Sequence, residues 1–204
     1  MFKNVIFDWS GVINDSIENH LLVVNKIFKR FGANEISMEE LRENWLQPYM
    51  LFYNKYFPDL TIEEEQAVYK ECIVNSPKSK PYLGIADVLK SFKIAEVKMV
   101  ILSSDSPETL LPEMADFGLD GVFTDIVMDA YDKSKSIRGL IDRNNFKAEE
   151  TIFIGDSNHE IEEGKRIGIK TGAVTWGYCT KTKLESLNPD FVIDTLEELK
   201  SVIL

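Results

Sequence analysis

Short apolar runs rich in β-branched residues recur along this chain, and segments with helical periodicity separate them. The runs lie at residues 5–7, 98–102, 151–154 and 170–174. Such uninterrupted apolar character is typical of parallel strands that are buried on both faces. Helical patterns occur at 106–117, 136–143 and 160–167, and a short strand at 190–193 and a helix at 196–203 follow. The alternation predicts an α/β fold with a Rossmann-like, doubly wound parallel sheet.

A long insertion interrupts this alternation after the first run. About ninety residues separate the first two runs, far more than a single crossover connection requires. Residues 16–80 are almost wholly helical in pattern. A first helix ends near Gly32, and Ser37 is placed to cap a second helix, with Glu40 three residues further on.

Two prolines, Pro77 and Pro81, mark the return of the chain to the sheet, since proline resists both helix and strand. The sequence therefore predicts an α/β core domain at 1–15 and 80–204 with an inserted α-helical domain at 16–79. At 204 residues and 44% hydrophobic content, the chain is long enough for one substantial core and a smaller accessory layer.

The composition disfavours several kinds of partner. The chain has 34 acidic and 23 basic residues, a formal net charge of −11, which repels nucleic acids and anionic membrane surfaces. Its two cysteines, Cys72 and Cys179, belong to no Cys/His cluster and predict neither a disulfide framework nor a zinc site. The sequence has no apolar stretch of membrane-spanning length and no signal segment. We expect a soluble, cytoplasmic protein that binds neither nucleic acid nor membrane.

Acidic side chains follow two of the predicted strands at the points where the strands end. The first run leads into Asp8, in Asp8-Trp9-Ser10-Gly11-Val12. The third leads through Gly155 into Asp156, and Glu160 lies four residues further on. In an open α/β sheet, ligands bind at the carboxyl ends of the strands. An acid held there can act as a nucleophile or as a metal ligand, so the two acids predict an active site at this end of the sheet.

These motifs resemble those of the haloacid dehalogenase-like hydrolase superfamily, and the resemblance covers essentially the whole chain. The opening is similar to the family motif Asp-x-Asp-Gly-Thr, and the segment around Asp156 is similar to Gly-Asp-x-x-x-Asp. The insertion resembles that of the subgroup with a helical cap domain, which includes phosphoglycolate phosphatases, β-phosphoglucomutases and phosphonatases. The resemblance implies a Mg²⁺-dependent hydrolase, expected to be a phosphatase acting on a small phosphorylated metabolite. In it, Asp8 attacks phosphorus and forms an aspartyl-phosphate that water then cleaves.

The resemblance also implies roles for polar residues that follow other elements. Ser103, directly after the run at 98–102, is expected to donate a hydrogen bond to a phosphoryl oxygen, with Ser104 as the alternative. Lys133 is favoured over Lys135 as the cation that offsets the negative charge of the nucleophile and of the phosphoryl group.

The implied ligands of Mg²⁺ are Asp8, the backbone carbonyl of Ser10, and Asp156, because this ion prefers hard oxygen donors. Glu160 replaces the more common Asp of the family motif and is expected to act through water or from outside the ligands. His159, at the start of the following helix, is expected to face solvent.

Besides Ser104, four residues are expected to contact the substrate. Trp9 follows the nucleophile directly, and Trp45, Gln47 and Tyr49 lie near the first helix–helix junction of the insertion, which faces the site in related proteins. A competing interpretation is that the aromatic residues of this region form the hydrophobic core of the insertion itself; they are Trp45, Tyr49, Phe52, Tyr53 and Phe57.

Ser10 departs from the family pattern at a position that matters for catalysis. Most phosphatases of the family carry an Asp there, in a general acid–base role worth roughly 10²–10⁴ in rate, and a serine supplies no ready base at neutral pH. Three interpretations follow: a slow phosphatase, a C–P bond hydrolase, or a phospho-ligand binding or interaction protein. The second is suggested by the similar Asp-Trp-Ala-Gly motif of phosphonoacetaldehyde hydrolases, which use a Schiff-base lysine from the cap, and Lys55 is the candidate for it. A haloacid dehalogenase is disfavoured, because that branch carries an aromatic residue where Ser10 stands.

Overall fold

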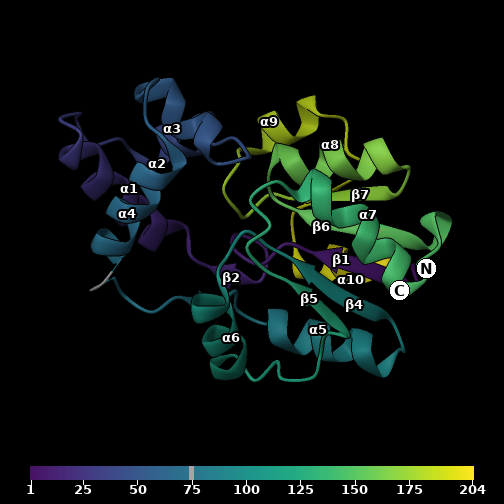
Figure 1. Cartoon of the computed structure of the whole chain (residues 1–204). Helices are drawn as coiled ribbons and strands as arrows, with labels where there is room; N and C mark the ends of the chain where they lie inside the picture. The colour runs from purple at the N-terminus through teal and green to yellow at the C-terminus, as the bar shows by residue number, and fades with distance from the viewer. Residues whose placement is uncertain (74–75) are drawn as a thin grey trace.

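A computed structural model describes residues 1–73 and 76–204 of the chain. Its centre is a six-stranded sheet in the order β5-β4-β1-β6-β7-β8, and all neighbouring strands are parallel (Figure 1). The strands are β1 (Asn4–Phe7), β4 (Lys98–Leu102), β5 (Asp125–Val127), β6 (Thr151–Gly155), β7 (Lys170–Val174) and β8 (Phe191–Ile193). The predicted α/β fold is confirmed, and β5 is a strand that the sequence analysis did not predict.

The central strands are buried on both faces, which explains their uninterrupted apolar sequences. In β1, Val5 and Phe7 pack into one hydrophobic cluster, whereas Ile6 between them packs into another on the opposite face. The same alternation occurs in β4, where Ile101 joins the first cluster and Val100 the second. Successive side chains of a strand point to opposite faces, so a strand covered on both sides needs apolar residues at every position.

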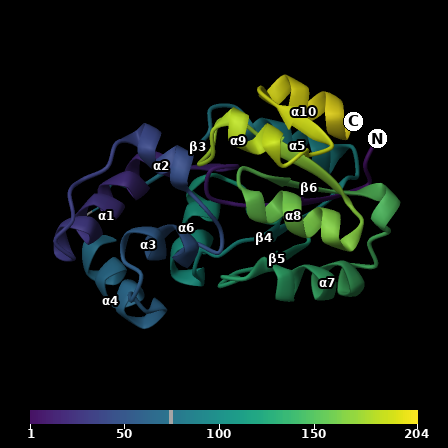
Figure 2. The same cartoon turned by 90° about the horizontal axis from the view of Figure 1, so that it is seen from above.

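Helices cover both faces of the sheet. Helices α5 and α10 lie on one face and α7 and α8 on the other, as Figure 2 shows. The helices outside the insertion are α5 (Ile85–Ile94), α6 (Pro107–Asp116), α7 (Lys133–Asn144), α8 (Asn158–Ile167), α9 (Lys181–Ser186) and α10 (Leu196–Ile203), with a short 3₁₀ turn, η1 (Ala148–Glu150). Within the described residues, no helix is both long and apolar enough to cross a membrane.

Four helices between β1 and β4 form a separate group at the side of the sheet (Figure 1). They are α1 (Ile17–Arg30), α2 (Met38–Asn44), α3 (Met50–Tyr56) and α4 (Ile62–Ile73), and we call them the four-helix segment. The predicted cap of the second helix is present, because the Ser37 side chain accepts a hydrogen bond from the backbone N–H of Glu40. The aromatic residues singled out in this region, among them Trp45, Phe52 and Tyr53, pack in its hydrophobic cluster.

Two short strands connect the four-helix segment to the sheet. Strand β2 (Asn14–Asp15) leaves β1, strand β3 (Lys80–Pro81) returns, and the two pair antiparallel. Asn14 lies opposite Pro81, and Asp15 lies opposite Lys80. Both connections therefore leave the core side by side, close to the carboxyl end of β1.

Candidate active site

Three adjacent strands end in polar side chains that meet at one place. Asp8 follows β1, Ser103 follows β4 and Asp156 follows β6, and the sheet order places β1 between the other two. Phe7 pairs with Ile101 on one side and with Ile154 on the other, so the three strand ends are level. The side chains of Asp8, Ser103 and Asp156 are nearly inaccessible, at 4%, 1% and 2% exposed.

A single buried lysine joins two carboxylates of this site. The Nζ atom of Lys133 lies 2.8 Å from Oδ2 of Asp8 and 2.6 Å from Oε1 of Glu160. Lys133 is the first residue of α7 and is fully buried, whereas the side chain of Lys135 is 82% exposed and lies near Asp132. Of the two lysines that the sequence offered, the structure brings Lys133 to Asp8.

Glu160 forms the second ion pair of Lys133, and its own carboxylate is fixed by Ser157 at the start of α8. Its Oε2 atom accepts hydrogen bonds from the backbone N–H of Ser157 at 3.0 Å and from the Ser157 hydroxyl at 2.7 Å. The Ser157 side chain in turn accepts a hydrogen bond from a backbone N–H of the first turn, which completes a capping box. Both carboxylate oxygens of Glu160 are thus engaged by protein groups.

Two glycines make room for the Asp156 carboxylate. A Cβ atom at Gly11 would lie 2.0 Å from Oδ2 of Asp156, and one at Gly177 would lie 2.1 Å from the same atom. Gly11 also has a φ of +81°, which side chains rarely allow. The backbone N–H of Tyr178 donates to this Oδ2 at 2.6 Å. The carboxylate is therefore closely surrounded by backbone and fixed in position.

The acidic cluster fits a divalent cation with oxygen ligands. Asp8, Asp156 and Glu160 each offer an oxygen, and these oxygens all lie within 4.8 Å of one another. Burial raises the pKa of Asp8 to about 7, although Lys133 opposes this, and burial with the nearby charge of Asp8 raises the pKa of Asp156. Three carboxylates share one ammonium group, so a bound dication would balance the two remaining negative charges and favour the ionised form of the acids.

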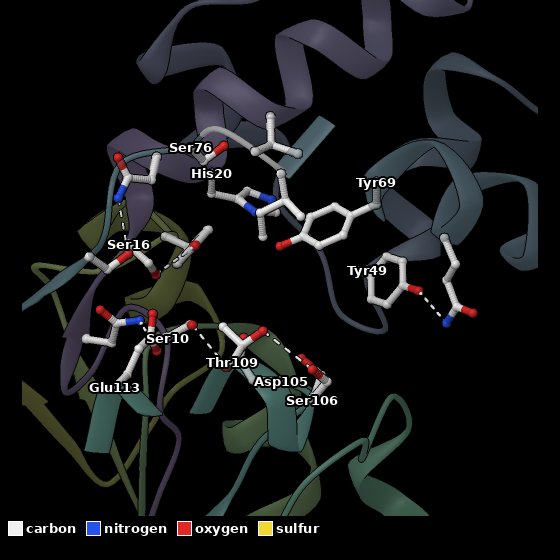
Figure 3. A pocket seen from close by; sticks show the side chains of 18 of the residues that line it. Ser10, Ser16, His20, Tyr49, Tyr69, Ser76, Asp105, Ser106, Thr109 and Glu113 are labelled. Carbon is white, nitrogen blue, oxygen red and sulfur yellow. Dashed lines mark hydrogen bonds between the residues drawn. The ribbon is translucent and has the colours of Figure 1, made fainter. Parts of the chain in front are cut away.

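Asp105 is a site residue that the sequence analysis missed. It lies two residues after Ser103, and its Oδ2 atom accepts a hydrogen bond from the Ser103 hydroxyl at 2.7 Å. The same atom accepts from the Ser10 hydroxyl at 2.9 Å (Figure 3). The backbone N–H of Asp105 donates to the Ser103 hydroxyl at 3.1 Å. The segment Ser103-Ser104-Asp105 follows a predicted buried strand, which was the signal available, but the contact with Ser10 joins residues 95 positions apart.

A cavity of about 790 Å³ lies between the ends of the strands and the four-helix segment. Asp8, Ser10, Ser104 and Asp156 line it from the core, and His20 and Tyr69 project into it from the helices (Figure 3). Of the predicted substrate contacts, Trp45, Gln47 and Tyr49 line the cavity. Trp45 also packs in a hydrophobic cluster with Phe52 and Tyr53, as the competing interpretation expected, and its contact with substrate stays a prediction.

Trp9 does not reach the cavity, contrary to the sequence-based expectation. Its side chain is fully buried and stacks on Phe117 with ring centroids 5.6 Å apart. Its Nε1–H donates to Glu113 of α6 at 2.8 Å, and the Asn14 side chain donates to the same carboxylate oxygen at 2.9 Å. Since the side chain points into the core, Trp9 helps to fix the turn after β1 and does not face the substrate.

The expectation that His159 faces solvent is also wrong. Its side chain is buried, because α7 packs against the start of α8 and the His159 Nε2 atom lies 3.6 Å from Asp132, which caps α7. The neighbouring Asn158 reaches the four-helix side: its Oδ1 accepts from the backbone N–H of Gln47 at 2.9 Å and its Nδ2 donates to the Gln47 carbonyl at 3.0 Å. The first turn of α8 thus positions Gln47 at the cavity.

Lys55, the candidate Schiff-base lysine, is not brought to the site. Its side chain is exposed, donates a hydrogen bond to Asn44, and is not among the described residues that line the cavity. The structure therefore removes the residue on which a phosphonatase-like mechanism was based.

The sheet order makes this an α/β protein with strand-end acids and a buried lysine at one site, and comparison with known proteins gives the class and the family. The family model described as haloacid dehalogenase-like hydrolase matches residues 5–174. The chain belongs to the haloacid dehalogenase-like hydrolase family.

The relatives of the chain are named as phosphatases and pyrophosphatases. A phosphoglycolate phosphatase of Aquifex aeolicus is 26% identical, with 96% of this chain and 93% of the relative covered. The pyrophosphatase PpaX of Halalkalibacterium halodurans is 24% identical, with 98% and 96% covered. The crystal structure of a predicted phosphatase from Clostridium acetobutylicum superimposes with a TM-score of 0.84 at 22% identity, covering 100% of this chain and 98% of that one.

Proposed function

We propose that this protein is a Mg²⁺-dependent phosphatase that hydrolyses a small phosphomonoester through an aspartyl-phosphate on Asp8. The observation that carries the proposal is the state of the Asp8 carboxylate at the cavity wall. One of its oxygens accepts from the backbone N–H of Trp9 at 2.8 Å, and the other lies 2.8 Å from Lys133. A carboxylate fixed in this way is oriented for attack on phosphorus, and the phosphatase names of the relatives support the same chemistry.

Lys133 and Ser103 act on the transferred phosphoryl group. The ammonium of Lys133 is buried beside the nucleophile, so it stabilises negative charge on the phosphoryl oxygens in surroundings where water screens it little. Ser103 follows the neighbouring strand, and its hydroxyl, which donates to Asp105 in this structure, would turn to donate to a phosphoryl oxygen; Ser104, which lines the cavity, is the alternative donor. Glu160 keeps Lys133 in place and charged.

Asp8, Asp156 and the backbone carbonyl of Ser10 are the proposed ligands of Mg²⁺. The buried, acidic oxygens, which lie close together, support a small, hard cation. When bound, the ion supplies positive charge to the phosphoryl group. Glu160 is proposed to lie outside the ligands, where it pairs with Lys133 and accepts hydrogen bonds from Ser157.

Asp105 takes the acid–base role that Ser10 cannot perform. Its carboxylate lines the cavity and is hydrogen-bonded to Ser10, the residue that stands where family phosphatases carry their acid. In the first step the proton of Asp105 goes to the leaving oxygen while the P–O bond breaks and phosphorus bonds to Asp8. In the second step the carboxylate of Asp105 accepts a proton from water as that water attacks phosphorus and frees Asp8.

Residues 16–79 form the proposed cap domain, and residues 1–15 and 80–204 form the core domain. The paired strands β2 and β3 support a hinge at 14–16 and 78–81, because both connections run together there. Opening of the cap would admit substrate to the cavity, and closing would exclude water from it. Retention of Asp8, Lys133 and Asp156 in one site favours an enzyme over a phospho-ligand binding protein.

Steady-state hydrolysis of an aryl phosphate, with and without Mg²⁺, tests the proposed function. Aryl phosphates have good leaving groups and depend little on a general acid, so the wild type is expected to turn over only with Mg²⁺. Asp8→Asn is expected to lower kcat by at least about 10³-fold, because it removes the nucleophile. Undiminished turnover in Asp8→Asn, or no turnover by wild type in either condition, would contradict the proposal.

A further inference from the structure

One buried acid of the cavity takes no part in the proposed chemistry. Glu65, on α4 of the four-helix segment, lines the cavity and is only 3% exposed. It forms no ion pair with any residue of the described chain. Burial raises its pKa to about 7, and the nearby Tyr49 hydroxyl opposes this rise. A carboxylate removed from water without a cationic partner is costly, so this side chain suits a ligand that brings a positive charge.

A second group near Glu65, the hydroxyl of Tyr53, is without a hydrogen-bond partner in the described residues. The hydroxyl of Tyr53, a residue 1% exposed that lines the same cavity, makes no hydrogen bond within residues 1–73 and 76–204. The charge of Glu65 acts on this hydroxyl, which places the two groups near each other. Buried polar groups are nearly always hydrogen-bonded in native proteins. An unpartnered hydroxyl at a cavity wall therefore indicates a ligand atom that it would contact.

Aromatic rings surround this part of the cavity. Tyr49 packs edge-on against Tyr53 and Tyr131, with ring centroids 6.2 Å and 6.0 Å apart, and all three line the cavity together with Tyr69. In Figure 3, Tyr69 and Tyr49 lie on the side of the cavity formed by the helices, opposite Ser10 and Asp105. Tyrosine rings attract cations through their faces, so the rings and the carboxylate favour the same kind of group.

The predominance of acidic residues in the cavity lining disfavours a second anionic group on the substrate. Seven acidic residues line it: Asp8, Glu65, Asp105, Glu108, Glu113, Asp129 and Asp156. The lysines among the described lining residues are Lys70 and Lys78, both with exposed side chains, and Lys78 is hydrogen-bonded to Asp116. No arginine lines it within the described residues. A carboxylate such as that of phosphoglycolate would meet repulsion here, whereas an ammonium group would be attracted.

We propose that Glu65, with the hydroxyl of Tyr53 and the ring of Tyr49, binds an ammonium group on the substrate, so that the substrate is the phosphomonoester of an amino alcohol. The phosphoryl group lies at Asp8, and the amine of the leaving group lies at the wall formed by α4. This inference rests on the proposed phosphatase activity and specifies the substrate of the same site.

Two matched series of substrates test this inference. The first contains ω-aminoalkyl phosphates of increasing chain length, and the second contains n-alkyl phosphates in which a methyl group replaces each ammonium group. At the length that spans the cavity, kcat/KM for the amine is expected to exceed that for its alkyl partner by about 10- to 100-fold, the effect of a charged hydrogen bond. Phosphoglycolate is expected to be a poorer substrate than either.

Substitutions in α4 test whether Glu65 causes the preference for aminoalkyl phosphates. Glu65→Gln is expected to reduce the amine-to-alkyl ratio to about one, because it removes the charge that distinguishes the two series. Glu63→Gln changes the same charge on an exposed face of the same helix and is expected to keep the wild-type ratio. Thermal melting of both variants checks that they fold, and the wild-type comparison between the two series stands without either variant.

The outcomes separate this inference from the proposed function. If alkyl and aryl phosphates are hydrolysed and no chain length shows an amine preference, the ammonium site is wrong while the phosphatase proposal stands. If a preference exists but survives in Glu65→Gln, the site is also overturned, because another group must recognise the amine. If no phosphomonoester of any kind is hydrolysed, the proposed function fails and the inference fails with it.

Discussion

At the scale of single residues, the proposed acid–base chemistry depends on the pair of Ser10 and Asp105. The two side chains are joined by a hydrogen bond of 2.9 Å, and Asp105 also accepts from Ser103 at 2.7 Å. A carboxylate thus lies next to Ser10, within reach of the role proposed for it. Replacing Ser10 by Asp would place two carboxylates next to each other, and their repulsion would change the protonation of Asp105. The proposed acid–base role of Asp105 therefore relies on the uncharged side chain of Ser10.

The role of Asp105 predicts a dependence on the leaving group. Asp105→Asn is expected to lower kcat/KM for alkyl phosphates by about 10²-fold, because an alkoxide leaves poorly without a proton. The same variant is expected to have a much smaller effect on aryl phosphates, whose leaving groups need little protonation. Measuring kcat/KM for a series of leaving groups in wild type and variant gives this comparison.

Asp129→Asn is a matched control for this experiment. Asp129 also lines the cavity, so its replacement removes the same charge without touching Ser10 or Ser103. It is expected to affect alkyl and aryl phosphates alike. An equal loss on both substrate classes in Asp105→Asn would show that Asp105 only supports the structure.

At the scale of secondary-structure elements, the site is built where strands end and helices begin. Asp8 and Asp156 follow strands, whereas Lys133 and Glu160 lie in the first turns of α7 and α8. The turn after β1 must pass close to the Asp156 carboxylate, and Gly11 makes this possible. The geometry of the site is therefore sensitive to any side chain added in this turn.

Gly11→Ala is expected to abolish activity and to destabilise the fold. Its Cβ atom would lie 2.0 Å from Oδ2 of Asp156, so either the turn or the carboxylate has to move. Gly32→Ala is the control, because Gly32 has a similar φ of +77° but no atom within 4 Å of the added Cβ. Both variants lose about 1 kcal/mol of unfolding free energy from backbone strain. Aryl phosphate turnover should be lost only in Gly11→Ala; normal turnover in that variant would contradict the described geometry.

The strands that the sequence predicted are those whose burial leaves a strong pattern. Strands β4 and β7 have the predicted bounds, and β1 and β6 differ by one residue. Strand β5 was missed because it has three residues, all half-buried, at the edge of the sheet. A short, half-buried edge strand has neither the uninterrupted apolar run of a central strand nor a long alternating pattern.

The residues of the candidate site also fall into two groups: those with a local sequence motif and those whose position depends on the folded structure. Asp8, Lys133 and Asp156 could be predicted because each stands in a local motif next to a recognisable strand or helix. The partnership of Asp105 with Ser10 could not, because it depends on how two strand ends meet in space. The burial of His159 was missed for a similar reason, since it depends on the packing of α7 on α8.

At the scale of the whole molecule, the contact between the four-helix segment and the core includes a titratable residue, His20. His20 and Trp45 both belong to the four-helix segment, and Tyr178 belongs to the core. The His20 ring packs edge-on against Trp45 and Tyr178, with ring centroids 4.9 Å and 5.2 Å away. Burial lowers the pKa of His20 to about 4. The neutral imidazole is therefore the form that suits this contact.

This shift predicts a pH-dependent loss of stability. Between about pH 6.5 and pH 4, His20 is protonated in the unfolded chain but remains neutral in the folded one, so acid favours unfolding. We expect wild type to lose about 1–2 kcal/mol of unfolding free energy relative to His20→Phe between pH 7 and pH 5. Urea unfolding of both proteins at the two pH values measures this difference. A difference that does not change with pH would show that His20 is not kept neutral by the fold.

Trapping the covalent intermediate tests the central claim most directly. The wild-type protein is mixed with Mg²⁺ and an aryl phosphate, quenched in acid during turnover, digested, and analysed by mass spectrometry for phosphorylated peptides. The account predicts a phosphate on Asp8, absent when Mg²⁺ is omitted and absent in Asp8→Asn. A phosphate on another residue, or no phosphorylated peptide at Asp8 while product is formed, would contradict it.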